Sequence, residues 1–177
     1  MIKIDAGDFF LVEPSEEYAE QIAEYKQACL DADSSMDGCG PLRRCEDSLT
    51  YISECRKYTS PETLPDGWVL STQFFYIRKA DNRLVGMIQV RHYFNDWLSR
   101  FGGHIGYSIK PDERRKGYAT SMLKAVLPYC KEIGLDKILI SCIDKNVGLS
   151  KVLRRMSSAD TRSLQVQVRR SSRKSSW

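Results

Sequence analysis

Apolar residues recur with a helical period in the first part of the chain. They return every three or four positions from Tyr18 to about residue 33, and Ser15 precedes the run as an N-cap with two glutamates in the first turn. This pattern predicts a helix over residues 15–33. Its inner face is predicted to consist of Tyr18, Ile22, Tyr25 and Cys29. A second helix is predicted over residues 46–58, with an inner face of Leu49, Ile52 and Cys55.

From Trp68 onward the period of the apolar residues changes to two. Residues 69–78 and 84–93 are rich in β-branched and aromatic side chains, and a short polar turn separates them. This pattern predicts an antiparallel hairpin. A further strand is predicted over residues 103–110, where Pro111 ends it.

Helical and strand patterns alternate in the next part of the chain. A helix is predicted after the proline that ends the strand, with Gly134 as its C-cap and Pro128 causing a kink. Residues 137–143 are almost continuously apolar, which predicts a strand buried on both faces. Residues 146–156 are predicted to form a short helix. This order of elements predicts a single domain of the mixed α/β (α+β) class.

The net charge of the 177-residue chain is +4, and it is not spread evenly. Residues 157–177 carry all of it, so that residues 1–156 balance to zero. The net charge therefore does not indicate nucleic-acid binding by the domain. With 42% hydrophobic and 28% charged residues, the composition is that of a globular protein and excludes a disordered, collagen-like or coiled-coil chain.

The sequence also bears on compartment and metal content. The first ten residues contain acids where a signal peptide requires an apolar stretch, and no apolar run approaches the ~18 residues of a membrane helix. The six cysteines form no CxxC pair, and only His92 and His104 could add nitrogen ligands. We therefore expect a cytoplasmic protein with reduced thiols, no metal and no membrane contact.

One segment has a pattern typical of anion binding. After the strand over residues 103–110, the turn reads Arg114-Arg115-Lys116-Gly117-Tyr118-Ala119 and leads into a helix. The first amides of a helix have no intrahelical acceptor and lie at the positive end of the helix dipole. Gly117 and Ala119 leave room for a phosphate to approach the backbone, and the three cations add positive charge. The segment predicts a site for a pyrophosphate-sized ligand.

The spacing Arg114-x-x-Gly117-x-Ala119 resembles the Gln/Arg-x-x-Gly-x-Gly/Ala signature of the GNAT superfamily of acyl-CoA-dependent N-acyltransferases. The strands before and after the helix, and Asn146 at the start of the last helix, match that family in order and spacing. The resemblance implies a central mixed, mostly antiparallel sheet flanked by helices. It also implies acetyl-CoA as the cosubstrate.

Carried over residue by residue, the resemblance implies a set of cofactor contacts. Backbone groups of Tyr107, Ser108 and Ile109 would pair with the pantetheine arm. Asn146 would contact the pantetheine from the neighbouring strand end, where two parallel strands splay apart. The pyrophosphate would be held by the backbone amides of Arg114, Arg115, Lys116, Gly117, Tyr118 and Ala119.

The resemblance further implies that a neutral amine attacks the acetyl thioester directly. His104 is the candidate base, because it lies on the strand where many relatives place a glutamate, and its ordinary pKa of ~6.5 suits the role. The alternative is a packed or surface imidazole. Strand alternation puts Ile105, Tyr107 and Ile109 on the face opposite His104. The family's general-acid tyrosine is replaced by Leu153, which cannot donate a proton.

Residues 157–177 depart from the family pattern. Relatives continue with a glycine-rich turn and two further strands, whereas this segment is rich in serine and has almost no large apolar residues. Leu164, Val166 and Val168 could alternate as one short strand. We therefore expect an acyltransferase domain over residues 1–156, with its final strands missing or replaced. The basic tail is expected to be disordered or out of frame, from a frameshifted or truncated C-terminus.

The sequence thus favours an acetyl-CoA-dependent N-acetyltransferase that acts on a primary amine. The alternative is a catalytically impaired protein that keeps the fold and the CoA site. A nucleic-acid-binding tail is disfavoured, because its cations lack interleaved aromatic residues. A homodimer is compatible with the sequence. Acidic residues precede and begin the second predicted helix, and they either border a pocket for a cationic acceptor or form a solvated acidic surface. They are Asp31, Asp33, Asp37, Glu46 and Asp47.

Overall fold

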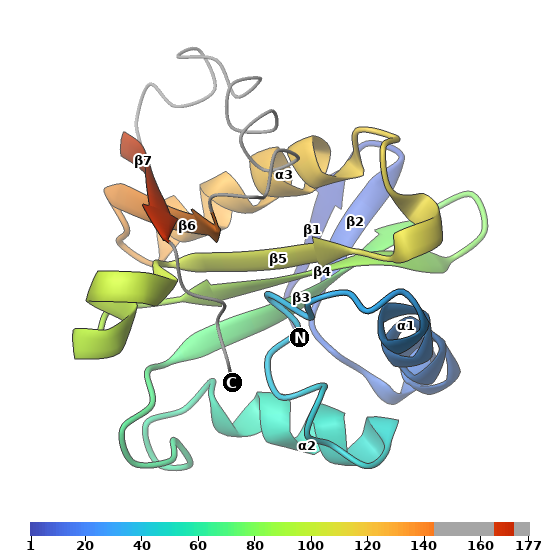
Figure 1. The fold of residues 1–177 in the computed structure, drawn as a ribbon, viewed down its shortest axis with the longest axis horizontal. Helices are drawn as coiled ribbons and strands as arrows, with labels where there is room; N and C mark the ends of the chain where they lie inside the picture. The colour runs from blue at the N-terminus through green and yellow to red at the C-terminus, as the bar shows by residue number, and fades with distance from the viewer. Residues whose placement is uncertain (144–164, 172–177) are drawn as a thin grey trace.

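A five-stranded antiparallel sheet lies at the centre of the computed structural model, which describes residues 1–143 and 165–171 (Figure 1). The strands follow one another in chain order across the sheet, so each pairs with its neighbour in sequence. They are β1 (Lys3–Ala6), β2 (Phe9–Val12), β3 (Ser71–Arg78), β4 (Arg83–Arg91) and β5 (Ile105–Ile109). The hairpin and the following strand predicted from the period of two are confirmed as β3, β4 and β5.

The first two strands were not predicted. They form a hairpin in which Ala6 pairs with Phe9, and the connecting Gly7 has a φ of 72°. Asp5 accepts a hydrogen bond from the Gly7 amide at 3.0 Å, which stabilises the turn. β2 then pairs with β3, so the N-terminal hairpin extends the sheet by two strands. The predicted element order, which begins with a helix, is therefore wrong at this end.

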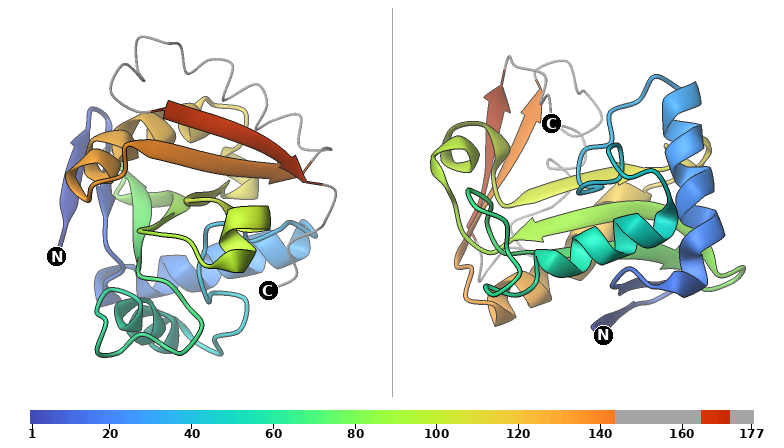
Figure 2. Two further views of the ribbon diagram at one scale, coloured as in Figure 1. Left: turned by 90° about the vertical axis from the view of Figure 1, so that its left-hand side faces the viewer. Right: turned by 90° about the horizontal axis from the view of Figure 1, so that it is seen from below.

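Helices cover both faces of the sheet (Figures 1 and 2). One face carries α1 (Ala19–Asp31) and α2 (Ser48–Lys57), and the other carries α3 (Tyr118–Glu132). A short 3-10 turn, η1 (Glu16–Tyr18), precedes α1, and Ser15 makes no side-chain cap bond there. The predicted inner face of the first helix is confirmed. Its buried residues are Tyr18, Ile22, Tyr25 and Cys29.

The second helix differs from its prediction in one residue. Ile52 and Cys55 are buried as expected, but Leu49 is 57% exposed and Tyr51 is fully buried in its place. At 100° per residue, Leu49 lies about 160° around the axis from Tyr51, on the solvent side. The helix begins later than predicted, and its N-cap Asp47 accepts a hydrogen bond from the Thr50 amide at 2.8 Å.

A second, two-stranded sheet consists of β6 (Lys137–Ile143) and β7 (Gln165–Ser171), which are parallel (Figure 2). Ile138, Leu139 and Ile140 are all buried, which confirms a strand covered on both faces. α3 continues through Pro128 without ending. The predicted helix over residues 146–156 lies outside the described residues. In the described part of the chain no helix is long and apolar enough to cross a membrane.

Candidate functional site

The two sheets meet where β5 begins. The His104 amide donates to the Leu139 carbonyl at 2.7 Å, and the His104 Nδ1 accepts from the Leu139 amide at 3.0 Å. Gly103 and Ile140 form an isolated bridge beside them. Beyond this contact β5 pairs with β4 and β6 pairs with β7, so β5 and β6 separate from each other. The bridge is antiparallel, whereas the splay expected beside Asn146 was between two parallel strands, and that expectation stays a prediction because Asn146 lies outside the described residues.

His104 is tightly held at this parting point. It is 8% exposed, and its ring stacks on Phe94 with the centroids 4.0 Å apart. Burial, and then the charge of Arg91, lowers the pKa of His104 to about 4. Because Nδ1 accepts a hydrogen bond, the neutral ring carries its proton on Nε2. These contacts favour the packed imidazole, and the role of His104 as a base stays a prediction.

The side chains of β5 alternate as predicted. Ile105 and Ile109 are buried in the core beneath α3, and Tyr107 packs against the same core. Ser108 faces α1 instead, where its Oγ lies 2.9 Å from the Tyr25 hydroxyl and 3.1 Å from the Cys39 sulfur. Burial raises the pKa of both partners, so all three groups are neutral. This hydrogen-bonded cluster fixes β5 against α1.

The loop between α1 and α2 crosses directly over β5. A Cβ on Gly38 would come closer than 3.0 Å to the Gly106 carbonyl and the Tyr107 amide, and Gly38 has a φ of 74°. The Gly38 carbonyl accepts a hydrogen bond from Gln73 at 2.9 Å. The loop therefore needs glycine at this position in order to reach the strand. The loop is predictable from the sequence, whereas this contact is not.

The turn predicted to bind an anion lies at the end of β5 and leads into α3. Arg115 and Gly117 have positive φ angles of 64° and 86°, which curve the backbone. The amides of residues 115–119 have no hydrogen-bond acceptor among the described residues. Alternating left-handed residues turn successive N–H groups toward one concavity, and the helix dipole adds positive potential there. A Cβ on Gly117 would meet nothing within 4 Å, so the approach to these amides is open.

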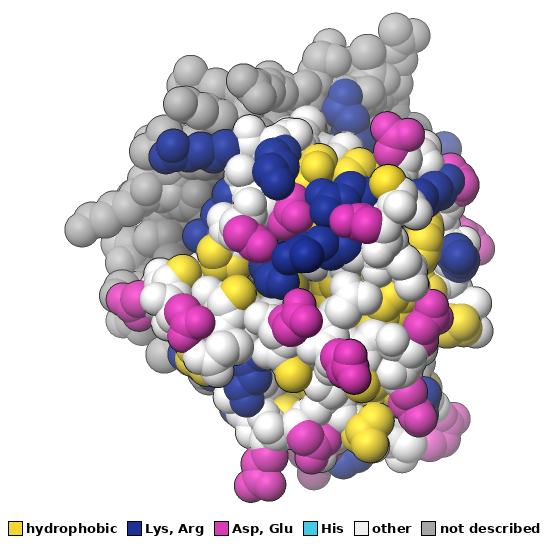
Figure 3. Space-filling view, turned by 90° about the vertical axis from the view of Figure 1, so that its right-hand side faces the viewer, with side chains coloured by type: hydrophobic (Ala, Val, Ile, Leu, Met, Phe, Trp, Pro, Cys, Tyr) yellow, Lys and Arg dark blue, Asp and Glu magenta, His cyan; other side chains and the backbone are white. Residues whose placement is uncertain are grey.

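The three cations of this turn differ in their surroundings, although all are exposed. The Arg114 Nε donates to the Ile109 carbonyl at 3.0 Å, which ties the turn to the end of β5. Lys116 forms an ion pair with Glu113 at 2.7 Å. Arg115 makes no ion pair with any described residue. Figure 3 shows this side of the molecule, where cationic and acidic side chains intermingle.

Behind the turn, Glu113 holds a network of cations. Glu113 is 5% exposed, and its carboxylate pairs with Arg78 at 3.0 Å as well as with Lys116. Burial alone would raise the pKa of Glu113, but hydrogen bonds from Lys116 and Arg78 outweigh it, and the pKa lies below its usual value. Arg78 also donates to the Tyr118 hydroxyl at 3.3 Å. The Tyr118 side chain is thus part of the support behind the turn, and its amide faces the site.

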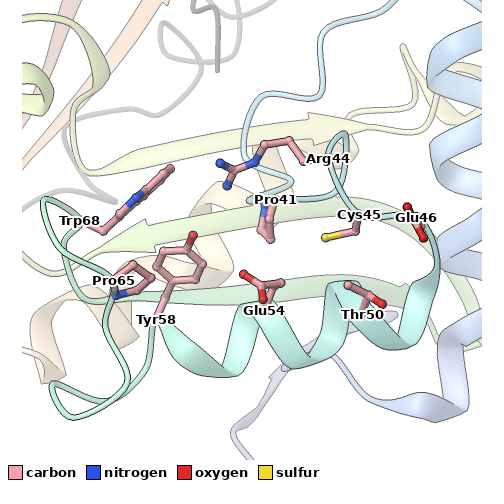
Figure 4. A pocket seen from close by; sticks show the side chains of 9 residues that line it. All are labelled: Pro41, Arg44, Cys45, Glu46, Thr50, Glu54, Tyr58, Pro65 and Trp68. Carbon is pink, nitrogen blue, oxygen red and sulfur yellow. The ribbon is translucent and has the colours of Figure 1, made fainter.

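An open groove of about 470 Å³ runs between α2 and the loop before it (Figure 4). Glu54 and Tyr58 point from α2 toward the loop that carries Arg44. The Arg44 guanidinium lies 5.2 Å from the centre of the Trp68 ring, and Tyr58 packs edge-on against the same ring. These residues were not predicted, because no local sequence pattern indicates that Arg44 lies next to Trp68. The groove is lined by Pro41, Arg44, Cys45, Glu46, Thr50, Glu54, Tyr58, Pro65 and Trp68.

The acidic residues before α2 are dispersed rather than gathered into one site. Asp31 and Asp33 are exposed, Asp47 caps α2, and Glu46 lines the groove. The described residues contain no cluster of His, Cys, Asp and Glu able to hold a metal ion. Asn146 and Leu153 lie outside the described residues.

Comparisons with known proteins agree with the fold. The sequence model of the acetyltransferase (GNAT) domain matches residues 9–157, whereas no curated protein matches the sequence. Three solved structures share the fold over 88–89% of this chain. The Vibrio fischeri ribosomal-protein-S5-alanine acetyltransferase has 12% identity, a TM-score of 0.60 and 82% of its chain covered. A Bacillus anthracis GNAT-family acetyltransferase has 20% identity, a TM-score of 0.54 and 82% of its chain covered. The microcin C7 self-immunity acetyltransferase MccE, in complex with acetyl-CoA and AMP, has 17% identity, a TM-score of 0.56 and 79% of its chain covered.

Proposed function

Because the chain belongs to the GNAT acetyltransferase family, we propose that it transfers the acetyl group of acetyl-CoA to a primary amine. The observation that supports this most is the turn between β5 and α3. It presents the amides of residues 115–119 at a helix N-terminus, with no acceptor for them among the described residues. Such an arrangement binds phosphate groups.

The residues present fit acetyl-CoA at this place. The amides from Arg114 to Ala119 would hold the pyrophosphate, and Arg115 would add a charge that no described carboxylate neutralises. The backbone of Tyr107, Ser108 and Ile109 would hold the pantetheine arm, because β5 is the last strand of its sheet. Asn146 is proposed to contact the same arm. When bound, acetyl-CoA supplies an activated acyl group as a thioester.

In the proposed reaction the amine nitrogen attacks the thioester carbonyl. A carbon–nitrogen bond forms, the carbon–sulfur bond breaks, and the electron pair of that bond leaves with sulfur. The amine loses one proton, and the CoA thiolate gains one. A backbone amide near the parting of β5 and β6 would polarise the carbonyl. His104 is the candidate base at this point, although its lowered pKa makes it a weak one at neutral pH.

A second candidate is a CoA-binding protein that does not turn over. It is favoured because neither of the two positions expected to transfer a proton holds a strong acid or base. Leu153 occupies the position of the family's general acid, and burial keeps His104 neutral with its Nδ1 already hydrogen-bonded. We also propose that the protein acts in the cytoplasm, because its described cysteines are free thiols.

Thermal unfolding with acetyl-CoA tests the cosubstrate site. A ligand at 100 times its Kd stabilises the folded state by about 2.7 kcal/mol, so the melting temperature should rise. Gly117→Ala should abolish most of the shift, since Gly117 has a φ of 86° and sets the turn. Gly134→Ala is the matched control. It lies at the other end of α3 with a φ of 84° and open space around it, so it carries the same strain without touching the turn.

The two variants should lose similar stability, and Gly134→Ala alone should keep the acetyl-CoA shift. A wild-type protein that shows no shift at millimolar acetyl-CoA would contradict both proposals. Release of free thiol in the presence of a panel of amines then separates the acetyltransferase from the CoA-binding protein, because only the enzyme releases thiol in proportion to amine.

A further inference from the structure

Arg91 lies at the end of β4, next to the point where β5 and β6 part. Its amide donates to the His104 carbonyl at 2.8 Å, and its Nη1 donates to the Gly103 carbonyl at 3.2 Å. Arg91 pairs with Ser71 across the strands, so its side chain is on the face that α1 and α2 cover. The guanidinium is therefore held against the start of β5, where an acceptor amine would have to reach the thioester.

The charge of Arg91 is only partly compensated. Burial lowers the pKa of Arg91 to about 10, and the charge of Asp37 opposes this effect without reversing it. Within the described residues no carboxylate oxygen lies within 4.0 Å of this guanidinium, whereas Arg78 has two such partners. A guanidinium has five N–H donors, and one of them is used on Gly103. The remaining donors can take an oxyanion in a bidentate manner.

A second polar group on the same face of the sheet lacks a hydrogen-bond partner in the described part of the chain. A Cβ on Gly106 would lie 3.4 Å from the Arg91 Nη2, so the missing side chain keeps the guanidinium close to β5. On the same sheet face, Gln73 is 4% exposed, and its Oε1 has no hydrogen-bond partner among the described residues. Gln73 pairs with Gln89, which in turn pairs with Gly106. A buried amide oxygen without a donor is costly, so the polar groups on this face of the sheet are incompletely satisfied by the residues described.

We infer that Arg91 binds an oxyanion of the acceptor, so that the acceptor is a small amine that also carries a carboxylate or a phosphate. This inference rests on the proposed function. Arg91 holds the oxyanion, and its fixed place beside His104 then orients the amine toward β5. The unmodified N-terminus of a protein has an amide beside its amine, not an oxyanion. The assignment therefore separates small acidic amines from protein N-termini as acceptors.

The test compares acceptors that carry an oxyanion with neutral counterparts that lack it. The probes are a panel of amino acids with their carboxamides, phosphoethanolamine with ethanolamine, and short peptide amides with a free N-terminus. Thiol release from acetyl-CoA gives kcat/KM for each. We expect the wild type to favour the anionic member of a pair by about 10- to 100-fold, as is usual for a charged hydrogen bond. The amino acid and phosphoethanolamine pairs distinguish the carboxylate from the phosphate.

The variants isolate the guanidinium. Arg91→Gln should remove most of the preference for the anionic probes and change turnover of the neutral ones little. Arg91→Lys should keep part of the preference for anionic probes, because lysine retains the positive charge but lacks the paired N–H donors of the guanidinium. Arg56→Gln, on the exposed face of α2, is the control and should behave as wild type. The acetyl-CoA melting shift should be the same in all of them, which shows that each variant folds and binds the cosubstrate.

Equal turnover of anionic and neutral probes by the wild type, or equal losses for both in Arg91→Gln, would overturn the inference. Faster turnover of the peptide amides than of the acids would also overturn it, in favour of a protein acceptor. The same probes are titrated into CoA-saturated and CoA-free protein by calorimetry. If no thiol is released, the comparison of binding affinities between anionic and neutral probes tests the inference. A missing acetyl-CoA shift in the wild type counts against the proposed function, whereas a missing preference for acids counts against Arg91.

Discussion

Gly38→Ala tests whether the loop between α1 and α2 is built onto β5. The substitution adds one methyl group at a residue whose φ is 74°. Placing alanine in the left-handed region costs about 1–2 kcal/mol. The new Cβ would also come closer than 3.0 Å to backbone atoms of Gly106 and Tyr107. Those residues are paired with Gln89 and Ile88 of β4, so they cannot move aside without disturbing the ladder.

The size of the effect follows from these contacts. Overpacking of this kind costs about 1–3 kcal/mol, and displacing the loop removes the 2.9 Å hydrogen bond from Gln73 to Gly38, at about 1 kcal/mol. With the φ cost, we expect a loss of about 3–6 kcal/mol in the free energy of unfolding. Gly7→Ala is the matched control, because Gly7 has a φ of 72° and its Cβ would meet nothing within 4 Å. It should lose only about 1–2 kcal/mol.

Urea denaturation followed by tryptophan fluorescence measures both variants. The two curves should have similar slopes and different midpoints, because the surface exposed on unfolding is unchanged. A Gly38→Ala protein as stable as Gly7→Ala would show that the loop does not rest on β5, and the account of the acceptor side would then fail with it.

Three further variants test the supports of the site. Glu113→Gln should lower stability at pH 7 by about 2–3 kcal/mol. Because the pKa of Glu113 is below its usual 4.5, its contribution is present above that value and is lost as the pH falls through the lowered pKa, so a gap in melting temperature that does not narrow at all on acidification would be evidence against the ion pairs. The pKa of His104 is lowered from 6.5 to about 4, first by burial, so unfolding takes up a proton between those values and stability falls as the pH drops through them. In urea titrations His104→Gln should flatten that fall, and an unchanged slope would contradict the assignment. Tyr25→Phe should cost about 1 kcal/mol by removing the hydrogen bond to Ser108, and a neutral effect on the urea midpoint would show that the cluster does not hold β5.

Features that depend on local patterns could be predicted from the sequence. The inner face of α1, the hairpin of β3 and β4 and the buried strand β6 each follow from the spacing of apolar residues within one element. The N-terminal hairpin was missed although the sequence contains a signal for it. Gly7 and Asp8 separate two short strands, a two-residue turn that is typical of hairpins. Leu49 was misplaced because the spacing of Leu49, Ile52 and Cys55 drifts around the helix axis, so that Leu49 falls outside the buried arc of Tyr51, Ile52 and Cys55.

The candidate site divides in the same way. The turn proposed to bind an anion lies within six consecutive residues, so the proposal could be made from the residue types of that short segment. Arg91 and Gln73 carry no such local signal. Each is an ordinary residue near the end of a strand, and what distinguishes it is the register of β3, β4 and β5 together with the loop that covers them. The burial of both residues, the missing carboxylate partner of Arg91 and the missing donor for the Gln73 Oε1 are, among the described residues, results of tertiary packing alone.

The pairing of β2 with β3 has a consequence for the order of folding. Phe10 pairs with Ile77, and the segment between them contains both helices of one face. The β3–β4 hairpin closes a short loop and can form quickly, whereas β2 must wait for a loop of some sixty residues to close. During synthesis the N-terminal hairpin therefore leaves the ribosome long before the strand that covers it. Phe9, Phe10 and Leu11 must remain unpaired with β3 until Ser71–Arg78 follows, which leaves this short apolar segment open to aggregation while the chain is incomplete.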